Sequence, residues 1–125
     1  MSDPIALRTS LAFYRAWTEH DFDNAMTYVA DDIVCDAPAG RIAGAAAFRD
    51  FLEPFSRILT DSTLLASFGD EHTALLMYDT VTIPVANAPG AEWHTVVDGR
   101  ITYVRIIFDR APFDAVRAAA READQ

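Results

Sequence analysis

The sequence predicts one α+β domain, in which helices from the first half of the chain pack on a sheet formed by the second half. Apolar residues recur at helical spacing in the first half of the chain, and the period changes to that of strands in the second half. The chain has 125 residues and no repeat or linker that would divide it, which suits a single hydrophobic core. We therefore expect residues 1–125 to form one domain of the α+β class.

Three helices are expected in the first half of the chain. The first covers about Pro4 to Glu19, with apolar residues along one stripe. A short second helix covers about Phe22 to Val29, and Asp21 is its candidate N-cap. A third helix begins near Ala45. Pro54 falls inside its apolar pattern and should kink that helix or end it early.

The strands are expected as short runs of apolar and β-branched residues. "IVCDA" should form a strand between the second and third helices, and "PAGRIAG" a loop after it. The second half contains four further runs, which turn residues separate: "STLLASF", "TALLMYDTVTIPV", "AEWHTVV" and "RITYVRIIF". A last helix should cover about Pro112 to Ala123.

The Asp98-Gly99 pair predicts a two-residue hairpin loop between the last two strands. Such a loop places Val97 opposite Arg100 and fixes the register of the hairpin.

Counting outward from this loop pairs Glu92 with Arg105, and His94 then shares their face. The opposite face holds a mostly apolar set: Trp93, Thr95, Thr102, Val104 and Ile106. A bulge of one residue would exchange the faces of Glu92 and His94. Because neither face is built for water, we expect one face to cover the core and the other to contact a second copy of the chain, in a homodimer.

Composition excludes several classes of protein. The formal net charge of −9 argues against binding nucleic acid or an anionic membrane surface. No apolar run is long enough to span a bilayer and the start lacks the features of a signal peptide, so the cytoplasm is the expected location. Cys35 is the single cysteine, and the three histidines lack the spacing of a metal site. We therefore expect no internal disulfide, metal or cofactor.

The motifs resemble those of a known family. "FYRAWTEHDFDNAMTYVADDIVCDAPAG", followed by a glycine, a helix and "VDGRITYVRIIFD", is similar to the SnoaL-like group of the nuclear-transport-factor-2-like superfamily. The resemblance covers about Leu7 to Asp109. It implies a curved sheet wrapped by helices into a cone around an apolar cavity, with the outer sheet face commonly forming a dimer. Members include polyketide cyclases, steroid isomerases, epoxide hydrolases and non-catalytic binding domains, so the fold alone does not settle the function.

The chemistries of this superfamily match the chain only in part. In members that resemble limonene epoxide hydrolase, two acids and an arginine act together; the resemblance places them at Asp79, Ile106 and Met77, so one of three is retained. The last-strand acid of SnoaL-like cyclases also falls at Ile106. In members that resemble steroid isomerases, the tyrosine position falls at Phe13 with Tyr14 beside it, the base falls close to Asp36, and a buried acid falls near Trp93.

Asp79 and Asp36 are therefore the candidate catalytic residues. A carboxylate buried in an apolar pocket is suited to proton transfer. The structural alternative is an ion pair with a neighbouring arginine or exposure at an irregular edge for Asp79, and a turn at the end of a strand for Asp36. The candidate ligand-binding residues are Phe13, Tyr14, Trp17, Phe51, Phe55, Met77, Trp93, Val104 and Ile106. The predicted function is binding of a small, mostly apolar molecule, with cofactor-free acid–base catalysis of the isomerase, cyclase or dehydratase type. The alternative is a non-catalytic domain that binds a ligand or another protein.

Overall fold

Four helices and six strands make up the computed structural model of the chain, which describes residues 3–123. The helices are α1 (Ile5–Thr18), α2 (Phe22–Met26), α3 (Ala45–Ile58) and α4 (Ala111–Ala123). The strands are β1 (Val29–Ala37), β2 (Gly40–Ala43), β3 (Leu59–Gly69), β4 (Thr73–Thr82), β5 (Gly90–Val97) and β6 (Arg100–Phe108). The α+β class predicted from the sequence is confirmed.

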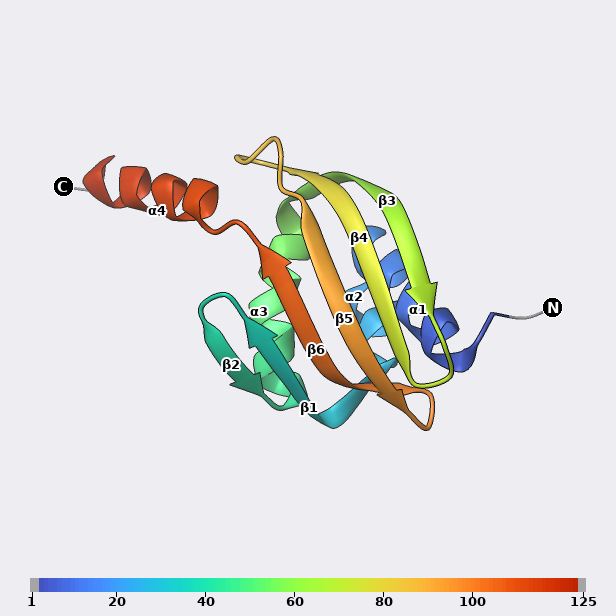
Figure 1. Ribbon diagram of the computed structural model, residues 1–125. Helices are drawn as coiled ribbons and strands as arrows, with labels where there is room; N and C mark the ends of the chain where they lie inside the picture. Colours follow the sequence, from blue (N-terminus) through green and yellow to red (C-terminus); the bar gives the residue numbers. More distant parts are fainter. Residues whose placement is uncertain (1–2, 124–125) are drawn as a thin grey trace.

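All six strands belong to one mixed sheet with the order β2-β1-β6-β5-β4-β3. β1 and β6 run parallel, and the other neighbouring strands are antiparallel. Figure 1 shows α1, α2 and α3 on the same face of the curved sheet, whereas α4 extends away from one end of it. One sheet face is therefore covered by helices and the other is left open.

The core lies between this covered face and the helices. The apolar stripe of α1 supplies the fully buried rings of Phe13 and Trp17, and α3 supplies Phe48. α3 continues through Pro54 to Ile58, so the predicted early end is wrong, whereas the kink stays a prediction. Proline removes one backbone donor from the helix, but the buried apolar face of α3 offsets that cost of about 3 kcal/mol.

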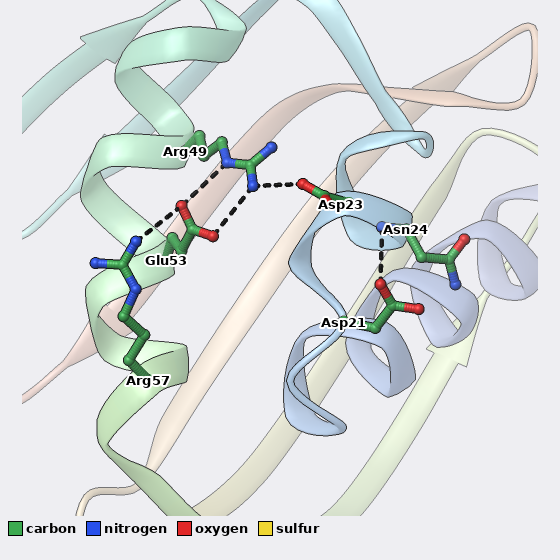
Figure 2. A network of polar contacts seen from close by, with 6 residues as sticks. All are labelled: Asp21, Asp23, Asn24, Arg49, Glu53 and Arg57. Atoms are coloured by element: carbon green, nitrogen blue, oxygen red, sulfur yellow. Dashed lines mark hydrogen bonds and ion pairs between the residues drawn. The ribbon is translucent and has the colours of Figure 1, made fainter.

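A charged network joins α2 to α3 on the surface of the molecule (Figure 2). The Arg49 guanidinium on α3 donates to Asp23 on α2 at 2.6 Å and to Glu53 one turn along α3 at 3.0 Å. The guanidinium also lies 5.7 Å from the centre of the Phe22 ring. Asp21 accepts from the Asn24 backbone N–H, which confirms it as the N-cap of α2.

The hairpin between β5 and β6 departs from the predicted register. Asp98 and Gly99 both have positive φ, and the two-residue loop pairs Val97 with Arg100 as expected. The register then shifts by one residue between Thr95 and Val96. A bulge of this kind moves every later side chain of the strand to the opposite face.

Because of this shift Glu92 pairs with Ile106, not Arg105. The predicted faces are wrong for the following residues: Glu92, Trp93, His94, Val96 and Ile101. Trp93 pairs with Arg105 on the open face. Glu92 and His94 lie in the core, with exposed fractions of 1% and 0%.

Two further boundaries differ from the prediction. β1 begins at Val29, four residues before the predicted strand, and the second helix is correspondingly shorter. The segment 40–43, predicted as part of a loop, forms β2 and pairs with β1.

The open face of the sheet is rich in exposed apolar side chains. Phe68 on β3 is 70% exposed and Ile107 on β6 is 62% exposed. Between them, on β4 and β5, lie Leu75, Met77 and Trp93, also exposed. Cross-strand pairing aligns Phe68, Leu75 and Trp93 in one row across three strands. We call this row and its neighbours Met77 and Ile107 the outer apolar face.

Candidate functional site

A cavity of about 410 Å³ opens between α3, the inner face of the sheet and the start of α4. Most of its wall is apolar. The side chains that line it include Phe51, Leu52, Pro54, Phe55, Ile58, Tyr78, Ala88, Pro89, Gly90, Ile106, Phe108 and Phe113. A cavity of this size and composition is typical of a site for a small, mostly apolar molecule.

Tyr78 on β4 is a residue of this cavity wall that carries a hydroxyl group. Its ring lies against Gly90, the residue that pairs with it on β5 and that also lines the cavity. A β-carbon placed on Gly90 would lie 2.8 Å from Cε1 of Tyr78 and 3.1 Å from its Oη. The absence of a side chain at Gly90 therefore allows the phenol to occupy this position.

Behind Tyr78 the structure brings together a buried polar chain from α1, β4 and β5. Tyr78 Oη donates to Glu92 Oε2 at 2.5 Å, and the second carboxylate oxygen of Glu92 lies 2.8 Å from Nε2 of His94. Nδ1 of His94 lies 2.7 Å from Oγ of Ser10. All four residues are buried, so each hydrogen bond replaces one that water would otherwise supply.

The electrostatics keep the phenol protonated. Burial, reinforced by the nearby carboxylate of Glu92, raises the pKa of Tyr78 well above its usual value. Tyr78 is therefore a neutral hydroxyl at physiological pH, and it is the member of this buried polar chain that lines the cavity.

The predicted ligand-binding residues divide into three groups. Phe51, Phe55 and Ile106 line the cavity. A second group packs in the core without lining it: Phe13, Tyr14, Trp17 and Val104. Tyr14 Oη and Trp17 Nε1 are buried and have no hydrogen-bond partner within residues 3–123. The third group, Met77 and Trp93, belongs to the outer apolar face and points away from the cavity.

Asp79, the first candidate catalytic residue, lies on the open face of β4 and is exposed. β4 alternates strictly between buried and exposed residues, and the flanking Tyr78 and Thr80 are the ones that point inward. The expectation of a carboxylate in an apolar pocket is wrong for this residue. Asp79 shares one side of β4 with Leu75 and Met77. This apolar side was expected to face the cavity, but it lies on the open face of the sheet.

Asp36, the second candidate, is held in an ion pair at the end of β1. Its carboxylate accepts from Arg41 at 2.8 and 2.9 Å and from the Tyr103 hydroxyl at 2.7 Å. These hydrogen bonds, that of Arg41 first, hold the pKa of Asp36 well below its usual range. A carboxylate with so low a pKa is a weak base, and its contacts are those of a structural ion pair.

The cavity also has charged side chains in its wall, from α4 and from the residue before it. Arg110, Asp114 and Arg117 line the cavity, and Asp114 forms ion pairs with Arg110 at 3.7 Å and Arg117 at 3.3 Å. α4 has no buried residue, but Phe113 packs edge-on against two rings of the cavity wall.

The sequence did not predict the buried hydrogen-bond chain that includes Glu92 and His94, because the assumed register placed both residues on the open face. Their i, i+2 spacing did indicate that they share a face. A second signal lay in β6, where the apolar residues Ile101 and Val104 are three apart. Strict alternation cannot bury both of them, so their burial requires the observed bulge.

Comparison with known proteins identifies the fold. A family model described as a SnoaL-like domain matches residues 11–104. The chain belongs to the SnoaL-like domain family. A crystal structure of a protein from Kribbella flavida is 65% identical to this SnoaL-like chain, covers 94% of it and 97% of its own length, and has a TM-score of 0.89. No curated protein sequence matches the chain.

Two more distant structures share the SnoaL-like fold. A steroid delta-isomerase from Pseudomonas aeruginosa is 16% identical, with a TM-score of 0.74 over 99% of this chain and 100% of that one. An LEH-like epoxide hydrolase from M. tuberculosis is 24% identical, with a TM-score of 0.69 over 84% of this chain and 83% of that one. At these identities the likeness establishes the fold and the resemblance predicted from the sequence, and leaves the chemistry to the site itself.

Two features of the described residues bear on cofactors and membranes. Within residues 3–123, no cluster of three or more His, Cys, Asp or Glu side chains is arranged to hold a metal ion. In the same part of the chain, no helix is long and apolar enough to cross a membrane.

Proposed function

We propose that the cavity binds a small, mostly apolar molecule with one polar group directed at Tyr78. The observation that carries this proposal is a cavity of about 410 Å³ with a mostly apolar wall, in which one buried, hydrogen-bonded phenol lies apart from the charged side chains of Arg110, Asp114 and Arg117. Apolar walls supply affinity through burial, and a single fixed polar group supplies orientation.

A matched pair of substitutions on β6 tests binding. Ile106 lines the cavity, whereas its neighbour Ile107 points outward. Isothermal titration calorimetry with the bicyclic alcohol 2-decalol should show binding to the parent chain and to Ile107→Trp, and loss of binding in Ile106→Trp. Equal affinities in the two variants, or no binding to the parent, would refute a ligand site in this cavity.

A second candidate function is cofactor-free proton transfer, which the Tyr78–Glu92 pair favours. Glu92 lies behind the phenol, so it would act through it: a ligand X–H gives its proton to Tyr78 Oη while the phenolic proton passes to Glu92 Oε2. The reverse transfer, returned to another atom of the ligand, would complete an isomerisation in which no electrons are gained or lost. This assignment replaces Asp79 and Asp36 with Glu92, a base that is linked to the cavity through Tyr78.

Deuterium exchange distinguishes this reaction from binding alone. In D₂O, the parent chain should accelerate incorporation of deuterium at the carbons beside the carbonyl of 2-decalone, measured by NMR. Tyr78→Phe should bring the rate back to that of buffer, because the route between ligand and Glu92 is then broken. If the parent chain binds ligands but does not accelerate the exchange of this probe, the non-catalytic binding domain is the better description.

The outer apolar face supports a further proposal, that two copies of the chain associate through it. Phe68, Leu75 and Trp93 form a continuous exposed row across β3, β4 and β5. Contiguous apolar surface of this kind favours association, and one face can meet itself across a two-fold axis. Trp93→Glu should yield a monomer in analytical ultracentrifugation, while Asp79→Lys, on the same face but outside the row, serves as the matched control. A parent chain that is monomeric at about 100 μM would refute the proposal.

A further inference from the structure

The buried chain Ser10–His94–Glu92–Tyr78 has a direction, which follows from counting its protons. Ser10 Oγ has Nδ1 of His94 as its hydrogen-bond partner, and no side-chain hydrogen bond from it to another acceptor is present within residues 3–123. The serine hydroxyl therefore donates to Nδ1. A neutral imidazole whose Nδ1 accepts carries its proton on Nε2, which donates to Glu92 Oε1.

The proton between His94 and Glu92 lies on Nε2 or on Oε1, and in neither case on Oε2. Oε2 of Glu92 has only lone pairs to offer, so Tyr78 must donate to it. A phenol has one hydrogen, and in this arrangement it is committed to Glu92. The oxygen atom of Tyr78 is left with lone pairs for any group that approaches from the cavity.

We infer that the cavity selects ligands that present a hydrogen-bond donor to Tyr78, and so takes an apolar alcohol in preference to the ketone of the same skeleton. This inference rests on the ligand site proposed above and adds the chemical class of the ligand's polar group. A hydroxyl donates to Tyr78 Oη. A carbonyl oxygen would face the lone pairs of the phenol and lose the hydrogen bond it makes with water.

The direction in which these hydrogen bonds donate is set by the two bonds that the Glu92 carboxylate accepts. One substitution at Glu92 can therefore reverse it. In Glu92→Gln the amide oxygen accepts from His94 Nε2–H, and the amide N–H₂ therefore faces Tyr78. The amide donates to the phenol, whose own hydrogen is released and can turn to the cavity. The variant should then favour a ketone.

The experiment compares the dissociation constants of 2-decalol and 2-decalone, which differ in the oxygen group alone, by isothermal titration calorimetry. The parent chain should bind the alcohol more tightly, by on the order of tenfold. Glu92→Gln should reverse the order, and Tyr78→Phe should bind both with similar affinity because it keeps the ring and removes the oxygen. Circular dichroism confirms that each variant is folded.

The outcomes separate this inference from the proposed function. If neither probe binds the parent chain, the ligand site itself is refuted, and this inference with it. If both bind but the ketone is preferred or the two are equal, the proposed ligand site stands. The inferred direction of the hydrogen bonds from Ser10 to Tyr78 is then refuted. Should Glu92→Gln fail to fold, the comparison of the parent with Tyr78→Phe decides, because a preference that survives loss of the phenol does not come from Tyr78.

Discussion

Gly90 should be the glycine at which a methyl group most strongly disturbs the site. It lines the cavity opposite Tyr78, and an added β-carbon would lie 2.8 Å from Cε1 and 3.1 Å from Oη of that ring. Gly90 does not adopt a left-handed conformation, so alanine suits its backbone and would by itself stabilise the fold by about 0.4–1 kcal/mol. The contact with Tyr78 therefore decides whether Gly90→Ala raises or lowers the free energy of unfolding.

The ring has little room to move, because Tyr14 and Trp17 pack against it with ring centres 5.5 and 5.6 Å away. Overpacking of this kind costs about 1–3 kcal/mol, and displacement of the hydroxyl would also weaken its bond to Glu92, worth about 1.5–3 kcal/mol. After subtracting the gain from alanine, we expect Gly90→Ala to lower the free energy of unfolding by about 2 kcal/mol.

Urea unfolding followed by circular dichroism measures this loss, and a double-mutant cycle isolates its cause. Tyr78→Leu removes the atoms that the new methyl group meets, so Gly90→Ala should cost little in that background. The reasoning is refuted if Gly90→Ala is as stable as the parent chain, or if its cost is unchanged when Tyr78 is leucine.

Three further predictions follow from the positions of single side chains. Asp79→Asn should leave the affinity for 2-decalol within about twofold of the parent, because Asp79 lies on the open face; a tenfold loss would contradict its placement. The pKa of Asp36 is lowered by Arg41 and Tyr103, so its contribution to stability is present above the usual aspartate value of about 3.9 and is lost as the pH falls below it. Asp36→Asn should therefore be less stable than the parent at about pH 7, and the difference should shrink at about pH 3 in urea unfolding; an equal difference at both pH values would contradict the ion pair. Phe113→Ala should speed amide exchange in α4 with little effect on β4 and β5, since no residue of this helix is buried and its ring makes the aromatic contacts to the cavity wall.

The sequence was sufficient for the elements of the fold and insufficient for the faces of its strands. Helical periodicity located α1 and α3, and the Asp98-Gly99 turn located the last hairpin, because both signals are local. The face of a strand depends on register, which is a property of two strands together. One bulge next to Thr95 was enough to put Trp93 on the open face, and Glu92 and His94 on the covered face, in place of the reverse.

Asp79 shows the same limit on a strand without a bulge. β4 carries Leu75, Met77 and Asp79 on one side and Leu76 and Tyr78 on the other. Both sides are apolar enough to face a core, and composition alone does not say which is covered by helices. Asp79 was predicted to be buried because its neighbours on the outer face of β4 are apolar.

The position of Ile106 explains how a cavity without a last-strand acid can still have an ionisable group. The resemblance to catalytic members of the superfamily places an acid at this residue, and its absence suggested a binding domain. In the structure Ile106 pairs directly with Glu92, so the two side chains share the inner face on neighbouring strands. The carboxylate lies on β5 in place of β6, and Tyr78 lies between it and the cavity. In the proposed ligand site the acid would have no direct contact with the ligand, so the phenol, through the direction of its single hydrogen, would be the group that selects what binds.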